Sequence, residues 1–363
     1  MKKIVALLLA SVMAVSATAC SNSSTTSSAA SQATSAAESQ AEASSTAAKT
    51  DFKVAMVTDT GGVNDQSFNQ SSWEGLQQFE KDTGAKVSYT ESKQESDYAT
   101  NLDKAADDGN KLIWGIGFAM ADAITNAAKA NPDINYAIID NSYENTPSNV
   151  TGVVFRAQEP SFLVGYIAGK TTKTNKVGFV GGIKGVVIDQ FEFGYRAGVA
   201  YAAKELGKTI TVDSQYAESF SDSAKGKAIA SKMYSNGCDI VFHAAGNVGV
   251  GVIEAAKEAK KLVIGVDKDQ SYLAPENVLT SAMKLVNKAI ELVSKDALEG
   301  KQIGGKTYDY GLTEDAVGIP EKHDLMSDET YNAAIALEQK IKDKTITPPA
   351  NEQDFKTFEA SLK

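Results

Sequence analysis

The sequence predicts an α/β protein of two similar lobes, each a doubly wound parallel sheet, joined by a hinge of three strands. From residue 52 onward, short apolar runs alternate with stretches of helical spacing. This alternation is typical of parallel sheets that are covered by helices on both faces. The alternation restarts near residue 176 in the same order of strand, loop and helix. A pattern that occurs twice predicts two lobes.

The two halves also resemble each other residue by residue. The stretch “KVAMVTDTGGVNDQSFNQSSWEG” begins at Lys53, and “KVGFVGGIKGVVIDQFEFGYRAG” begins at Lys176. An alignment without gaps pairs Lys53 with Lys176, Val57 with Val180, Gly62 with Gly185, Phe68 with Phe191, and Gly75 with Gly198. Each half is therefore expected to place one phenylalanine near the start of its first helix.

The first residues predict export and a membrane anchor. Residues 1–19 combine a short basic start with the apolar run “IVALLLASVMAV”, which is typical of a signal peptide and too short to span a membrane. Cys20 follows small residues and resembles the cysteine of a lipobox, so we expect a lipid on its sulfur; a plain secretory signal is the alternative. The rest of residues 20–50 is rich in Ser, Ala and Thr and is expected to be a disordered tether. The expected location is the extracytoplasmic face of the cell membrane.

Charge and cysteine content exclude several classes of partner. The net charge of −10, without a basic patch, argues against a nucleic-acid polymer. Cys20 and Cys238 are the two cysteines of the sequence, and Cys238 lies in the apolar stretch “CDIVFHAAG”, so it is expected to be a core residue without a disulfide. A monomer is the expectation for this architecture.

Polar residues at the ends of the expected strands predict a binding site. Open parallel sheets bind ligands outside the carboxyl ends of their strands. The residues expected at these ends include Asp59, Asp140, Gly246 and Asp267. If the lobes face each other, Phe68 and Phe191 would close on a flat ring from opposite sides. The alternatives are that these phenylalanines belong to the lobe cores and that the aspartates cap helices.

The sequence gives little support for catalysis. His243 and His323 are the two histidines, and no G-x-S-x-G, H-E-x-x-H or Cys/His cluster occurs. The stretch “VGYIAGKT” lacks the spacing of a phosphate-binding loop. We therefore expect a binding protein, not an enzyme, without a cofactor or a metal.

Six motifs, in order, resemble a known family. They are “DTGGVNDQSFNQSSWEG”, “VVFRAQEPSFLVGYIAG”, “KVGFVGG”, “HAAGNVGVGVIEAAKE”, “VIGVDKDQ” and “LTSAMK”. They are similar to the basic membrane protein family of bacterial lipoproteins, which resemble type I periplasmic binding proteins. The resemblance implies a receptor for a purine nucleoside such as guanosine, inosine or adenosine. It also implies the permease and ATPase subunits of an ABC importer as partners.

The resemblance implies roles for residues around the base. Phe68 and Phe191 would sandwich the base, and Asp140 would bind its polar edge. Asn69 and Asp59 would lie near the ligand in the first lobe.

Around the sugar, the resemblance implies that Gly246 lets the backbone approach while Asp267 and Lys284 hold the ribose hydroxyls. Asn247-Val248 departs from the glycine-rich turn of the family, which puts the preference for ribose or deoxyribose in doubt.

The repeat also predicts the limits of the lobes. The first lobe is expected to comprise residues 51–155 plus about 282–308, and the second residues 156–281 plus about 309–363. The crossings are expected at “FRAQEPSF”, “NVLTSAMK” and “YDYGLTEDAVGI”. A sugar or autoinducer-type receptor of the same fold is the alternative function. An extracellular nucleoside-processing enzyme has less support.

Overall fold

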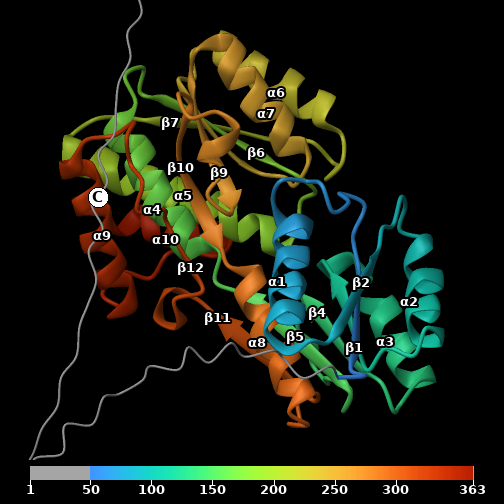
Figure 1. The fold of residues 1–363 in the computed structure, drawn as a ribbon. Coiled ribbons are helices and arrows are strands. Elements are labelled where there is room, and N and C mark those ends of the chain that lie inside the picture. Colours follow the sequence, from blue (N-terminus) through green and yellow to red (C-terminus); the bar gives the residue numbers. More distant parts are fainter. Residues whose placement is uncertain (1–49, 363) are drawn as a thin grey trace, which may run out of the picture. The chain divides into compact units, whose positions relative to one another are not determined.

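The computed structural model describes residues 50–362, which form two α/β lobes, each on a six-stranded sheet (Figure 1). The predicted fold class of two similar, mostly parallel sheets covered by helices is confirmed. The predicted signal peptide, the lipidation site Cys20 and the tether as far as residue 49 lie outside the described residues.

The sheet of the first lobe is parallel throughout and has the strand order β11-β5-β4-β3-β1-β2. Its strands are β1 (Lys53–Val57), β2 (Lys86–Thr90), β3 (Leu112–Ile116), β4 (Asn135–Ile139), β5 (Val150–Phe155) and β11 (Lys306–Tyr310). Its helices are α1 (Phe68–Thr83), α2 (Asp97–Asp107), α3 (Ala121–Ala130) and α8 (Val286–Leu298), with a 3-10 turn, η1, at Phe118–Met120.

Both faces are buried in the middle of this sheet, which explains why β1, β3 and β4 are nearly continuous apolar runs. Val54 and Met56 pack in one apolar cluster with α1 and α8, while Ala55 and Val57 pack in another with α2 and α3. Trp114 of β3 is fully buried, and its indole N–H donates to Ser294 Oγ of α8 at 3.1 Å. Because side chains alternate along a strand, these central strands pack against helices on both faces of the sheet.

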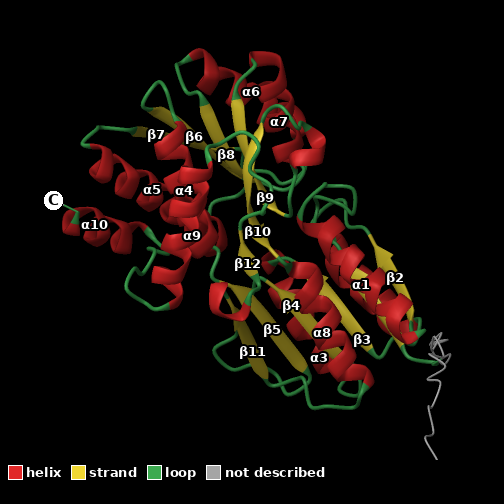
Figure 2. Cartoon of the chain, turned by 60° about the vertical axis from the view of Figure 1, so that its left-hand side comes forward, coloured by secondary structure: helices red, strands yellow, loops and turns green. Residues whose placement is uncertain are grey.

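The second sheet repeats this arrangement, with the order β12-β10-β9-β8-β6-β7. Its strands are β6 (Lys176–Gly181), β7 (Thr211–Tyr216), β8 (Ile240–Ala244), β9 (Leu262–Asp267), β10 (Val278–Lys284) and β12 (Val317–Gly318). Its helices are α4 (Gln158–Thr171), α5 (Val186–Leu206), α6 (Ser223–Ser235), α7 (Val248–Ala259), α9 (Asp328–Lys342) and α10 (Glu352–Ser361). A short antiparallel pairing of β12 with β10 distinguishes it from the first sheet. Figure 2 shows the two sheets with their covering helices.

Three chain connections run side by side between the lobes. Arg156 N–H donates to Tyr310 C=O at 2.7 Å, and Leu285 N–H donates to Ala316 C=O at 2.8 Å, so each connection is bonded to a neighbour. The guanidinium of Arg156 also pairs with Asp309 at 3.0 Å and with Glu314. These bonds restrict the connections to bending about a common axis, as a hinge requires.

The chain leaves the second sheet at the end of the segment that was expected to cross. “NVLTSAMK” forms β10 inside the second sheet, where it pairs with β9, and the chain changes lobes only after Lys284. The third crossing follows Tyr310, the last residue of β11 in the first sheet. The lobe limits at about 282 and 308 stay predictions.

Helices α4 and α5 touch at their backbones, and this gives a test of the fold. A Cβ added at Gly198 would lie 2.0 Å from Phe162 O. Gly198→Ala is therefore expected to lower the free energy of unfolding by about 1–3 kcal/mol, because the helices must move apart. Urea denaturation measures the change. The control is Gly318→Ala, since no atom lies within 4 Å of its added Cβ. Equal stability of Gly198→Ala and the unchanged chain would contradict the close packing.

Candidate functional site

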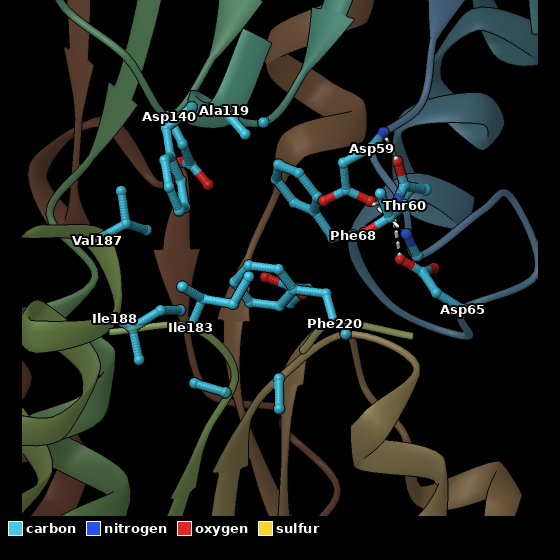
Figure 3. A pocket seen from close by; sticks show the side chains of 18 of the residues that line it. Asp59, Thr60, Asp65, Phe68, Ala119, Asp140, Ile183, Val187, Ile188 and Phe220 are labelled. Atoms are coloured by element: carbon cyan, nitrogen blue, oxygen red, sulfur yellow. Dashed lines mark hydrogen bonds between the residues drawn. The ribbon is translucent and has the colours of Figure 1, made fainter. Parts of the chain in front are cut away.

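A cavity of about 110 Å³ lies at the carboxyl ends of the strands, with walls from both lobes (Figure 3). One water needs about 10–15 Å³ of such space, so the cavity has room for a small molecule. The eight residues predicted to bind ligand all line it: Asp59, Phe68, Asn69, Asp140, Phe191, Gly246, Asp267 and Lys284. Their joint position follows from the rule that strand ends of facing sheets meet. Their binding roles stay predictions.

The first-lobe wall is a network of hydrogen bonds that holds the carboxylate of Asp59. Asn69 Nδ2 donates to Asp59 Oδ1 at 2.7 Å and to Asp65 Oδ2 at 2.9 Å. Gly61 N–H donates to Asp59 Oδ1 at 2.8 Å. Asp65, which the sequence analysis did not single out, is fully buried and lines the cavity beside them. The side-chain amide of Asn69 and the backbone N–H of Gly61 thereby fix the direction in which the Asp59 carboxylate faces the cavity.

Burial raises the pKa of Asp59 to about 7, opposed by the hydrogen bonds from Asn69 and Gly61 and assisted by the nearby carboxylates Asp65 and Asp140. A carboxyl group that titrates near neutral pH can both donate and accept a hydrogen bond. This wall can therefore bind either kind of polar group on a ligand.

Lys284 connects the two aspartates that end equivalent strands. Its Nζ lies 2.7 Å from Asp140 Oδ2 and 3.8 Å from Asp267 Oδ1. Both aspartates have φ of 66°, a left-handed conformation that aspartate tolerates better than most side chains. Burial raises the pKa of Asp267 to about 6 against the opposite effect of Lys284 and of Ser67, whose hydroxyl donates to it from the first lobe. Asp140 and Asp267, at the ends of strands that hold corresponding places in the two sheets, thus share one backbone conformation.

The two repeated phenylalanines line the cavity but differ in exposure. Phe68 is 9% exposed and Phe191 is 2% exposed, and the Phe191 ring packs 6.3 Å from that of Phe242. Lys284 Nζ lies 4.5 Å from the centroid of the Phe68 ring and 5.6 Å from that of Phe191. The ammonium therefore occupies space near both rings. The stacking role of Phe191 stays a prediction.

A second aromatic pair, which the repeat did not reveal, also lines the cavity. Phe118 of the first lobe and Phe220 of the second lie with ring centroids 6.3 Å apart and ring planes at 77°. Phe220 belongs to the loop between β7 and α6, and its side chain reaches into the cavity (Figure 3). The sequence signal for this role was that Phe220 is the one aromatic residue in the polar stretch Glu218–Asp222, just after a strand.

Gly246 allows this loop to approach. Its φ is 55°, and an added Cβ would lie 3.2 Å from Phe220 O. The side chain of the neighbouring Asn247 donates to Ser221 O at 2.9 Å. The departure from the family pattern at Asn247-Val248 thus contacts the Phe220 loop.

Residues 50–362 contain no group of His, Cys, Asp and Glu that could hold a metal ion. No helix in the same range is long and apolar enough to cross a membrane. His243 is fully buried, and burial lowers its pKa to about 4.

Comparisons with known proteins show which family this chain is similar to. Residues 52–352 match the family model described as ABC transporter substrate-binding protein PnrA-like. The chain is 42% identical over 311 residues to basic membrane protein A of Borreliella burgdorferi, covering 84% of this chain and 90% of the relative. It is 43% identical over 323 residues to the ABC transporter nucleoside-binding protein BmpA of Lactococcus lactis, covering 83% and 90%. A solved ABC transporter solute-binding protein from Aeropyrum pernix superposes with a TM-score of 0.78 at 25% identity, covering 86% of this chain and 97% of that one.

The raised pKa of Asp59 predicts a pH-dependent effect of Asp59→Asn on stability. Below about pH 4 this carboxyl holds its proton in both the folded and the unfolded chain. Between about pH 4 and pH 7 the folded chain keeps a proton that the unfolded chain has released, so rising pH favours unfolding. Asp59→Asn removes this cost, and its gain in free energy of unfolding is expected to grow across that window and then stay constant.

Urea denaturation without ligand at several pH values measures this difference. Asp97→Asn is the control of opposite sign, because backbone amide bonds from Lys93 and Gln94 lower the pKa of Asp97. Its loss of stability is expected at neutral pH and should vanish as the pH falls below the ordinary aspartate range. A pH-independent effect of Asp59→Asn would contradict the burial of its charge.

Proposed function

The chain belongs to the PnrA-like family of ABC transporter substrate-binding proteins, and we propose that it binds purine nucleosides between its lobes and delivers them to an import permease. It is a solute receptor for ABC transport, not an enzyme. The observation that carries the proposed ligand is one cavity that combines aromatic rings from both lobes with buried carboxylates. A flat base with a hydroxylated sugar offers groups that match both features.

The base would stack on Phe68, and Asp140 would accept from its polar edge. The opposite face has two candidates in the second lobe, Phe191 and Phe220. Asp59 and Asn69, held together at 2.7 Å, would lie within reach of the base or a ring substituent. Their joint ability to donate and to accept suits a purine, which carries both kinds of group.

The ribose would lie against Asp267 and Lys284, with Gly246 allowing close approach of the backbone. A carboxylate can accept from two neighbouring hydroxyls, and the ammonium can donate to a third oxygen. Asn247 would influence sugar preference through its bond to the Phe220 loop.

The charge of the cavity favours a neutral ligand that is rich in hydrogen-bond donors. Among the residues that line it, Lys284 is the single cation, and the carboxylic acids are Asp59, Asp65, Glu95, Asp140 and Asp267. Lys284 is already paired with Asp140 and lies near Asp267. A phosphate group would add charge repulsion, so guanosine should bind more tightly than its 5′-monophosphate.

The setting proposed for this receptor follows its relatives. A lipid on Cys20 would hold the protein on the extracytoplasmic face of the membrane, where a permease with its ATPase would take up the ligand. The name of the Lactococcus lactis relative supports a nucleoside as ligand. The described part of the chain would act as a monomer.

Calorimetry separates the proposed ligand from the alternative sugar or autoinducer class. The panel comprises guanosine, inosine, adenosine, guanine, free ribose and related sugars, and guanosine 5′-monophosphate. Binding of nucleosides without binding of free sugars supports the proposal. Binding of a sugar without any base, together with no binding of nucleosides, would replace it.

The aromatic contacts give a prediction with an internal comparison. Phe68→Ala is expected to weaken guanosine binding by about 1–3 kcal/mol, the cost of one lost stacking contact. Phe191→Ala and Phe220→Ala then identify which ring covers the second face of the base. Titration calorimetry measures all three. If none of the three variants loses affinity, the base does not stack between the lobes.

The two equivalent aspartates should respond differently to the ligand. Asp140→Asn is expected to weaken guanosine and guanine alike, because the residue is assigned to the base. Asp267→Asn is expected to weaken guanosine but not guanine, since its partner is the sugar. A lost hydrogen bond to a charged group costs about 1–3 kcal/mol, enough for calorimetry to resolve. An equal loss of guanine binding in Asp267→Asn would show that the sugar lies elsewhere.

A further inference from the structure

Away from the hinge, a group of bonds joins Gln66 and helix α1 of the first lobe to the segment after β9 of the second. Gln270 Nε2 donates to Gln66 O at 3.0 Å, and Tyr272 O–H donates to Gln66 Oε1 at 2.9 Å. Lys268 Nζ donates to both oxygens of Glu74, at 2.7 and 2.8 Å. None of these five residues lines the cavity.

The second-lobe side of these contacts is held by bonds within its own lobe. Gln270 is fully buried, its N–H donates to Ser281 Oγ at 3.1 Å, and its Oε1 accepts from Val266 N–H at 3.0 Å. Its Nε2 thereby points to the first lobe. A buried amide held in this way costs little additional ordering when it forms the bond across the cleft.

The first-lobe side is fixed by Asp65. Its carboxylate accepts from the backbone N–H groups of Ser67 at 2.9 Å, Asn69 at 2.8 Å and Gln70 at 3.0 Å. These bonds hold the turn in which Gln66 adopts φ of 57°. The acceptor groups of Gln66 are therefore presented to the second lobe in a set direction.

We propose that Gln66, Glu74, Lys268, Gln270 and Tyr272 form a latch that holds the lobes closed and sets the rate of ligand release. As far as it concerns a nucleoside, this inference rests on the proposed function. Bonds that exist only in the closed form shift the equilibrium toward that form, and they must break before the cavity opens. The latch residues thus determine affinity without touching the ligand.

Charge reversal at the exposed end of the latch tests this role. Glu74→Lys and Lys268→Glu are each expected to speed guanosine release about two- to fivefold, the range for a partly exposed ion pair. The association rate should change less, because a neutral ligand enters the open form. The double variant, which restores the pair with reversed charges, is expected to restore slow release. Tyr272→Phe, which removes a single hydroxyl from a half-exposed ring, should act in the same direction as the single charge reversals.

The matched control is the same exchange at Lys227 and Glu258, which pair at 2.7 Å on the second lobe between α6 and α7. This pair does not join the lobes, so its single and double variants should release guanosine at the unchanged rate. Stopped-flow fluorescence or surface-binding kinetics provides the two rate constants.

A second measurement needs no ligand. Spin labels at Lys104→Cys of α2 and Lys232→Cys of α6, both exposed, report the distance between the lobes. The single latch variants should shift the unliganded distances to longer values, and the double variant should reverse the shift. Unchanged distances and release rates in the single variants, or no rescue by the double variant, would overturn the latch. If the distances shift as expected but guanosine does not bind the unchanged chain, the latch stands and the proposed ligand does not.

Discussion

The buried ammonium of Lys284 is the interaction on which the arrangement of this protein depends. It ends the last long strand of the second sheet, bonds Asp140 of the first lobe at 2.7 Å, and lies 3.8 Å from Asp267. An unpaired buried charge costs several kcal/mol, so the ammonium requires both lobes to contribute carboxylates. The faces of Phe68, Phe155 and Phe191 surround it. Lys284 therefore lines the cavity and contacts carboxylates of both lobes at the same time.

The internal repeat supplies the symmetry of the cavity, and local differences supply its chemistry. Equivalent strands place Asp140 and Asp267 with the same left-handed backbone on opposite sides. The first lobe then adds the bonded group around Asp59, while the second adds Phe220 and the close approach at Gly246. A ligand with chemically distinct ends can therefore bind in a single orientation. A symmetric cavity would not specify one orientation of the ligand.

The residues proposed for binding and those proposed for closure lie in the same short segment. Asp59 and Phe68 face the cavity, while Gln66 between them bonds the opposite lobe, and Asp65 fixes the turn that holds all three. A ligand that contacts this loop thus acts on a segment that also makes closed-state bonds. Such an arrangement lets the latch change the release rate, and the affinity with it, without any change in the residues that face the cavity.

The sequence by itself predicted the fold class and the twofold repeat, because strand ends are readable from apolar runs and parallel sheets bring those ends together. Six of the eight predicted site residues followed from the strand ends and the repeat, while Asn69 and Lys284 followed from the family resemblance; all eight line the cavity. Tertiary structure alone decided that Phe191 is nearly buried, that Phe220 reaches the cavity, and that Asp65 orders its wall. Tertiary structure also decided that the chain crosses between the lobes after Lys284, through the pairing of β10 with β9. Apolar periodicity does not distinguish a cavity wall from a core, and a loop's reach depends on packing against elements distant in sequence.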